Sequence, residues 1–144
     1  MVIGIFGESC TGKSTLTEKI AASFPCEIVT GKDWLRLAKN ENIARVMFRK
    51  KLTTAVDCEN IIYVISEKEH LPLLPEGAVR ILVTAELETI KARFAQRMRG
   101  NLPVPVAAML EKKHGCFDAE PHEILVVSEE TELDDVLAHI EDRC

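Results

Sequence analysis

Residues 7–14 read Gly7-Glu8-Ser9-Cys10-Thr11-Gly12-Lys13-Ser14, and they match the phosphate-binding pattern G-x-x-x-x-G-K-[ST]. The preceding residues 1–6 are apolar and rich in β-branched side chains, which is typical of a strand buried in a parallel sheet. After the pattern, Leu16, Ile20 and Phe24 recur at helical spacing. The pattern therefore lies between a predicted strand and a predicted helix, where a phosphate-binding loop is expected.

This loop predicts how a nucleoside triphosphate is held. Glycines let the backbone curl so that its N–H groups point at the phosphates, and the helix N-terminus adds roughly half a positive charge. The Lys13 ammonium is expected to bridge the β- and γ-phosphates and the Ser14 hydroxyl to bind Mg²⁺, whereas Thr15 replaces Ser14 only with a shift in register. The predicted nucleotide site comprises Gly7, Glu8, Ser9, Cys10, Thr11, Gly12, Lys13, Ser14 and Thr15.

Length and composition favour one globular domain spanning residues 1–144, because 47% of the residues are hydrophobic. The net charge of −5 predicts no general attraction to nucleic acid or to an anionic membrane. No apolar run reaches the ~20 residues that span a bilayer, and the chain begins with a predicted strand instead of a secretion signal. We therefore expect a cytoplasmic protein.

The five cysteines are odd in number and lack C-x-x-C spacing, which favours reduced thiols over a disulfide framework. His114, Cys116 and His122 lie close together, but their spacing matches no standard zinc ligand set. A surface turn is the favoured interpretation, and no zinc is expected there.

Apolar, β-branched runs alternate with helical patterns along the chain. Further strands are predicted at 27–30, 60–65, 79–83 and 123–127. Helices are predicted from Leu87 to Met98 and over 133–140, the second behind a cap at Thr131, while 100–105 is predicted as a loop. Such alternation predicts an α/β fold with a parallel sheet, helices on both faces and ligand-binding loops at the carboxyl ends of the strands.

Basic residues gather at the end of the predicted helix that follows the fourth strand. Arg93 and Arg97 are one turn apart and share a face, just before the loop at 100–105. They form either a solvated face, partly neutralised by Glu86 and Glu88, or a pair that closes over the γ-phosphate and stabilises the charge that shifts during transfer. Beside a triphosphate loop, the second interpretation is favoured.

The phosphate loop and the R-x-x-x-R segment Arg93-Phe94-Ala95-Gln96-Arg97 together resemble the small P-loop kinases of the nucleoside-monophosphate kinase and shikimate kinase superfamily. The resemblance covers most of the chain and leaves the subfamily open. It implies a three-layer fold with a five-stranded parallel sheet of order 2-3-1-4-5. It also implies ATP on the phosphate loop, a short lid at about 97–106 with arginines on the phosphates, and an acceptor-binding segment at about 31–56.

The implied acceptor segment is rich in cations, which suggests an acceptor that carries phosphate or carboxylate, although a solvated helix face is the alternative. Asp33 is expected either to orient or deprotonate the acceptor hydroxyl or assist Mg²⁺, or else to cap the following helix. Trp34 either stacks on an acceptor base or packs in the core. The predicted acceptor-binding residues are Asp33, Trp34, Arg36, Arg45 and Arg49.

The residues after the third strand depart from the family, because Ser66-Glu67-Lys68-Glu69-His70 stand where a glycine-rich turn or an Asp-Gly pair is expected. Glu67 is then the nearest candidate, with Ser66, for holding Mg²⁺ through water. After the fifth strand, the turn Ser128-Glu129-Glu130 is expected to border the adenine.

The predicted function is that of an ATP- and Mg²⁺-dependent phosphotransferase that moves the γ-phosphate to a small acceptor, with a nucleoside monophosphate such as CMP or AMP preferred. Its catalytic residues are predicted to be Lys13, Asp33, Arg93 and Arg97. One alternative is an ATP- or GTP-binding switch, or slow NTPase, without a small-molecule acceptor, and another is a non-enzymatic interaction module. Either a monomer or a homodimer is compatible with the sequence.

Overall fold

Five parallel strands form the centre of the computed structural model, which describes residues 1–143. They are β1 (Val2–Phe6), β2 (Glu27–Thr30), β3 (Ile61–Ile65), β4 (Val79–Thr84) and β5 (Ile124–Val127). Their order in the sheet is β2-β3-β1-β4-β5, so the predicted strands and the predicted order are confirmed. Strand β1 is central and buried along its whole length, which explains why its residues are apolar on both faces.

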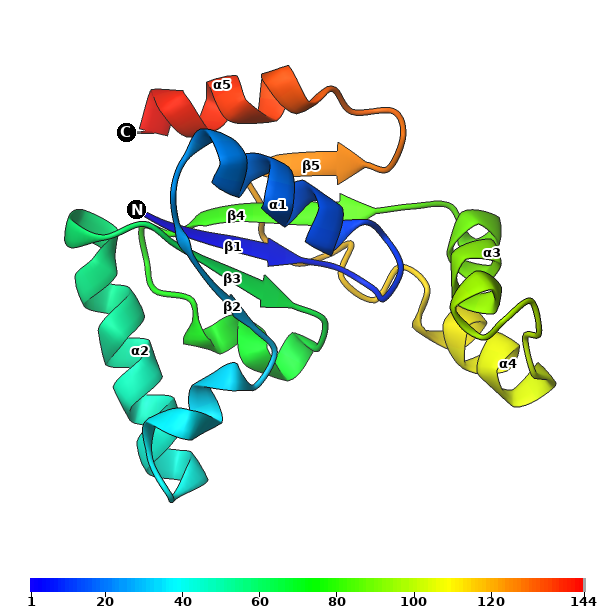
Figure 1. Cartoon of the computed structure of the whole chain (residues 1–144), viewed down its shortest axis with the longest axis horizontal. Helices are drawn as coiled ribbons and strands as arrows, with labels where there is room; N and C mark the ends of the chain where they lie inside the picture. Colours follow the sequence, from blue (N-terminus) through cyan, green and yellow to red (C-terminus); the bar gives the residue numbers. More distant parts are fainter. Residues whose placement is uncertain (144) are drawn as a thin grey trace.

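Helices cover both faces of this sheet, as Figure 1 shows. Helices α1 (Lys13–Ser23) and α5 (Leu133–Arg143) lie on one face, and α2 (Glu41–Cys58) lies on the other. Because successive strand residues point to opposite faces, Ile5 packs in the core under α1 and α5, whereas Phe6 packs in the core under α2. The three-layer architecture expected from the sequence is therefore present.

Two further helices lie beyond the carboxyl ends of the strands, α3 (Leu87–Arg97) and α4 (Val104–Lys113) (Figure 1). Ile90 of α3 and Leu110 of α4 pack with Cys10 in a small third core, which joins this helix pair to the phosphate loop. Helix α4 corrects the prediction of a loop at 100–105, because Pro105 stands in its first turn, where a missing N–H breaks no helical hydrogen bond.

The expected lid segment 97–106 consequently spans the end of α3, the connection and the first turn of α4. Its closing motion stays a prediction. The expected cap at Thr131 is wrong: α5 begins at Leu133, and the Thr131 hydroxyl instead accepts a hydrogen bond of 2.8 Å from the Val127 amide. This bond closes the turn between β5 and α5.

Two short 3-10 helices, η1 (Asp33–Leu37) and η2 (Lys68–Leu73), follow β2 and β3. A buried chain of hydrogen bonds fixes η1 against the sheet, since Trp34 Nε1 donates to the Tyr63 hydroxyl at 3.2 Å and that hydroxyl donates to the Gly31 carbonyl at 2.7 Å. Burial raises the pKa of Tyr63 to about 12, which keeps the hydroxyl protonated as a donor. Within residues 1–143, no helix combines the length and apolar character needed to cross a membrane.

Candidate nucleotide and acceptor site

The phosphate loop connects β1 to α1 at the carboxyl edge of the sheet. Gly12 is the N-cap of α1 and has a φ of 103°, a left-handed conformation that favours glycine. At Gly7 the backbone runs so close to β4 that a Cβ atom would lie 2.2 Å from the Val83 carbonyl oxygen. Both pattern glycines therefore have a steric reason in this fold, and the loop delivers the chain to a helix N-terminus.

Lys13 lies over this loop with 7% of its surface exposed. Its Nζ donates hydrogen bonds to the Gly7 carbonyl, at 2.9 Å, and to the Glu8 carbonyl, while Thr11 Oγ1 donates to the same Glu8 oxygen at 2.8 Å. Burial lowers the pKa of Lys13 to about 8, and the charge of Arg97 adds to the lowering. The loop thus holds a desolvated cation that a phosphate group would stabilise.

A pH dependence of nucleotide affinity follows from this pKa. A bound polyphosphate favours the protonated form of Lys13. As pH rises through about 8, Lys13 of the unliganded protein loses its proton, and the affinity for the nucleotide therefore falls. The phosphate charge stays constant in this range, because a phosphate monoester has its second pKa at about 6. We expect the dissociation constant for ADP, measured by calorimetry, to rise about tenfold from pH 7 to pH 9.

The matched control for this measurement is Lys13→Met, in which the dependence should be absent. An affinity of the wild-type protein that stays constant over pH 7–9 would contradict a Lys13–phosphate contact.

A cavity of about 740 Å³ opens beside the loop. Its walls come from the loop and the start of α1, from one face of α3, and from β5 with the turn that follows it. The lining residues are Cys10, Thr11, Gly12, Thr15, Leu16, Lys19, Val83, Arg93, Gln96, Arg97, Val126, Val127, Ser128, Glu129, Thr131, Glu132, Leu133 and Val136. The mixture of apolar strand residues and polar loop residues suits a base and sugar next to charged phosphates.

Arg93 and Arg97 both line this cavity but have different surroundings. The Arg93 guanidinium donates to the Cys10 carbonyl at 3.0 Å, to Ser128 Oγ at 2.8 Å and to Glu129 Oε1 at 3.3 Å. It therefore ties α3 to the phosphate loop and to the turn expected to border adenine. The Arg97 side chain is exposed and makes no hydrogen bond or salt bridge within residues 1–143, so it is free to reach a ligand.

The predicted acceptor residues lie on the other side of the loop, on η1 and α2. Asp33 is exposed, and its Oδ2 accepts hydrogen bonds from Thr30 Oγ1 at 2.8 Å and from the Thr30 amide at 3.2 Å. These bonds lower the pKa of Asp33, so the carboxylate is ionised at neutral pH. The carboxylate bonds back to β2, and the N-cap position of η1 is occupied by Lys32.

Trp34 lies in the core, which is the second of the two roles that the sequence allows. Only 1% of its surface is exposed, its ring stacks on Phe48 with centroids 6.2 Å apart, and the Arg45 guanidinium lies 5.6 Å from its centroid. Because the ring is buried, we do not include Trp34 among the proposed acceptor-binding residues. Arg36 and Arg49 are exposed, on η1 and α2 respectively.

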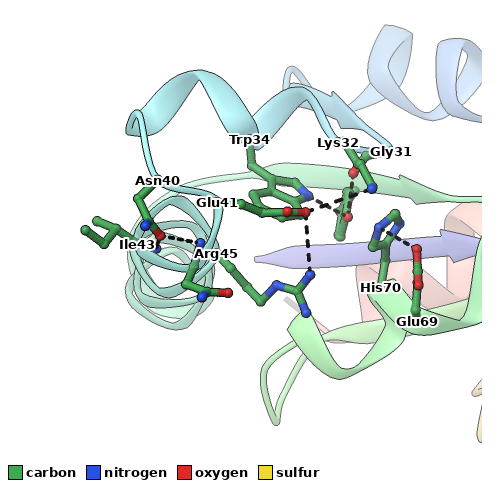
Figure 2. A network of polar contacts seen from close by, with 11 residues as sticks. Gly31, Lys32, Trp34, Asn40, Glu41, Ile43, Arg45, Glu69 and His70 are labelled. Atoms are coloured by element: carbon green, nitrogen blue, oxygen red, sulfur yellow. Dashed lines mark hydrogen bonds and ion pairs between the residues drawn. The ribbon is translucent and has the colours of Figure 1, made fainter.

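Arg45 also belongs to a mixed cluster of charges. The Lys32 Nζ atom and a guanidinium nitrogen of Arg45 each lie 3.9 Å from Glu41 Oε1. Figure 2 shows this group beside Glu69 and His70. The acceptor side is therefore less uniformly basic than the sequence suggests. Glu67, two residues after β3, is the N-cap of η2 and lies close to Glu69 and His70.

Ser14 is exposed in the first turn of α1. A hydroxyl in that position is an oxygen donor of the kind that Mg²⁺ prefers. Ser14 therefore fits one ligand position of a magnesium ion. The sequence did not single out Lys19, Gln96 or Thr131 as cavity residues, because only the folded arrangement of α1, α3 and β5 brings them together.

No protein-family model matches this chain. A shikimate kinase from Acinetobacter baumannii in complex with shikimate aligns with 98% of this chain and 90% of its own, at 12% identity and a TM-score of 0.63. A sugar kinase from Janibacter sp. HTCC2649 aligns over 98% and 92%, at 14% identity and a TM-score of 0.62. A gluconokinase from Sinorhizobium meliloti 1021 aligns with 99% of this chain and 90% of its own, at 14% identity and a TM-score of 0.59. At such identities the likeness establishes the fold: this chain has the fold of the small P-loop kinases.

Among curated proteins, the chain is similar to von Willebrand factor A domain-containing protein 5B1. The mouse protein (Mus musculus) is 32% identical over 105 residues, which are 70% of this chain and 8% of that protein. The human protein (Homo sapiens) is 32% identical over 65 residues, which are 45% of this chain and 5% of that protein. The matches thus cover only 5% and 8% of these relatives' own length.

Proposed function

We propose that this protein is an ATP-dependent phosphotransferase that moves the γ-phosphate to a small acceptor. The observation that carries the proposal is the cavity whose walls combine the phosphate loop with Arg93 and Arg97. Lys13, buried on the loop, does not line the cavity, but the charge of Arg97 acts on it, so a third cation lies near the pair. The P-loop kinase fold supports the proposal, since the shikimate kinase and gluconokinase that share it are named for phosphotransfer.

Each group has a role in this proposal. The loop amides and Lys13 bind the β- and γ-phosphates, and Arg97 moves onto the γ-phosphoryl group as its charge shifts toward the leaving oxygen. An acceptor oxygen attacks the phosphorus, the bond to the β–γ bridging oxygen breaks, and ADP leaves. Asp33, ionised and exposed, accepts a hydrogen bond from an acceptor hydroxyl and orients the acceptor. Where that hydroxyl is the attacking group, Asp33 takes its proton; where the attacking oxygen belongs to a phosphate, no proton has to be removed.

Mg²⁺ held by Ser14 would supply charge neutralisation at the phosphates. Arg93 is a positioning residue, because its hydrogen bonds hold the turn at Ser128 against the phosphate loop. Thus Arg93 supports the nucleotide cavity and Arg97 supports the transfer step.

For the acceptor, we propose a small molecule that carries phosphate or carboxylate, with a nucleoside monophosphate such as CMP or AMP as the first candidate. Exposed Arg36 and Arg49 support an anionic acceptor, and Arg45 with Lys32 lies nearby. Shikimate, which is bound to a kinase of the same fold, represents a second class of acceptor to be tested.

The test is incubation of the purified protein with Mg²⁺, labelled ATP and a panel of nucleoside monophosphates, nucleosides, shikimate and gluconate. We expect ADP formation with stoichiometric labelling of one class of acceptor. Release of free phosphate alone, or tight ATP binding without turnover, would contradict transfer and support the nucleotide-dependent switch. Asp33→Asn serves as the matched variant, and it should lower the rate for the true acceptor without weakening ADP binding.

A further inference from the structure

Two acidic side chains and a buried histidine converge where β3 passes into η2. Glu67, Glu69 and His70 each place one potential ligand atom within 4.8 Å of the others. The backbone explains this arrangement, since the His70 amide donates to the Glu67 carbonyl at 3.1 Å and so forms a tight 3-10 turn. Figure 2 shows the His70 ring facing the Glu69 carboxylate.

His70 is the unusual member of this cluster. Only 2% of its surface is exposed, and within residues 1–143 neither ring nitrogen has a hydrogen-bond partner. Buried polar atoms are normally hydrogen-bonded, so two open nitrogens on one buried ring need an explanation. The Nε2 atom lies 3.6 Å from Glu69 Oε1, beyond hydrogen-bond distance. A metal ion between this nitrogen and the carboxylate would pair both groups.

We propose that Glu67, Glu69 and His70 form a binding site for a divalent first-row transition ion such as Zn²⁺, distinct from the Mg²⁺ of the nucleotide. Imidazole nitrogen suits Zn²⁺ and related ions, whereas Mg²⁺ takes oxygen ligands. Tetrahedral Zn²⁺ with bonds of about 2.0–2.1 Å brings ligand atoms to about 3.3 Å from one another. Small rotations of the two exposed glutamate side chains provide that contraction around the fixed histidine.

The cluster lies close to the strand end that contacts the phosphate loop. The amide of Gly7, at the start of the phosphate loop, donates to the carbonyl of Ile65 at 3.3 Å, and Glu67 follows two residues later. On its other side the cluster faces Lys32 and Arg45. Three protein ligands leave at least one coordination position open to an oxygen ligand. The site does not depend on the proposed phosphotransfer, because it involves none of the nucleotide-binding residues of the loop.

The experiment is a calorimetric titration of the intact chain with Zn²⁺ in a millimolar excess of Mg²⁺, under reducing conditions without chelator. We expect one Zn²⁺ per chain in the wild-type protein, and an affinity at least tenfold lower in Glu69→Gln and in His70→Gln. Glu76→Gln, an exposed acid on the following loop, and His122→Gln, an exposed histidine near Cys116, are matched controls that should bind as the wild type does.

Thermal unfolding keeps the proposal testable if His70→Gln folds poorly. Zn²⁺ should raise the melting temperature of the wild-type protein and of both controls but not that of Glu69→Gln, whose changed side chain is at the surface. Equal Zn²⁺ affinity in wild type and Glu69→Gln, or loss of Zn²⁺ binding when Mg²⁺ is added, would overturn the proposal.

Discussion

Lys13→Ala is expected to reduce phosphoryl transfer by a factor of about 10³ or more, because it removes the only side-chain cation of the phosphate loop itself. Nucleotide affinity should also fall, since Lys13 is expected to contact the phosphates in the ground state as well. Protein stability should change little, because burial already disfavours the charged form of this lysine, as its lowered pKa of about 8 records. Steady-state kinetics and calorimetry with ADP measure the two losses separately.

Lys112→Ala is the matched control, because Lys112 is an exposed lysine in the last turn of α4. It should retain wild-type rates and affinity. A folded Lys13→Ala protein that keeps its full transfer rate would show that the loop does not hold the transferred phosphate.

Arg97→Ala is expected to lower kcat by about 10²–10³ while changing the dissociation constant of ADP by less than about threefold. The Arg97 side chain lines the cavity and makes no hydrogen bond or salt bridge in residues 1–143. It can therefore move onto the γ-phosphoryl group as transfer proceeds. Arg93→Ala should behave differently and weaken nucleotide binding, because Arg93 holds Cys10 and Ser128 together. Single-turnover kinetics and calorimetry on both variants distinguish the two roles.

Arg99→Ala supplies the control for this pair, since Arg99 follows the same helix but does not line the cavity. Equal losses of rate and of ADP affinity in Arg97→Ala would defeat the role in transfer, and a loss confined to kcat in Arg93→Ala would defeat its role in positioning.

The centre of the sheet could be predicted from the sequence because β1, β3 and β4 are short apolar runs buried along most of their length. The phosphate loop could also be predicted from the sequence, because local backbone geometry requires its glycines. Helix α4 was missed because Gly100, Pro103 and Pro105 are loop signals, although Pro105 is harmless in a first helical turn. The cap expected at Thr131 failed because the hydroxyl has a nearer partner in the Val127 amide.

The candidate site was predictable only in part. Spacing alone placed Arg93 and Arg97 on one face, and both line the cavity. Their different roles depend on partners that are distant in sequence, since Arg93 bonds to Cys10, 83 residues away. In the same way, packing against Phe48 buries Trp34, and packing against Trp34 contributes to the burial of His70. No local pattern records such contacts.

The central claim is that residues 7–15 bind the phosphates of a nucleoside triphosphate, and calorimetric titration of the intact chain with ATP and with ADP in Mg²⁺ tests it most directly. Measurement at two temperatures excludes an accidental zero in the binding enthalpy, because burial of apolar surface gives a heat-capacity change. We expect one nucleotide per chain, with affinity lost in Lys13→Ala. An absence of binding heat at both temperatures for ATP, GTP and their diphosphates, from protein with an intact circular dichroism spectrum, would contradict it.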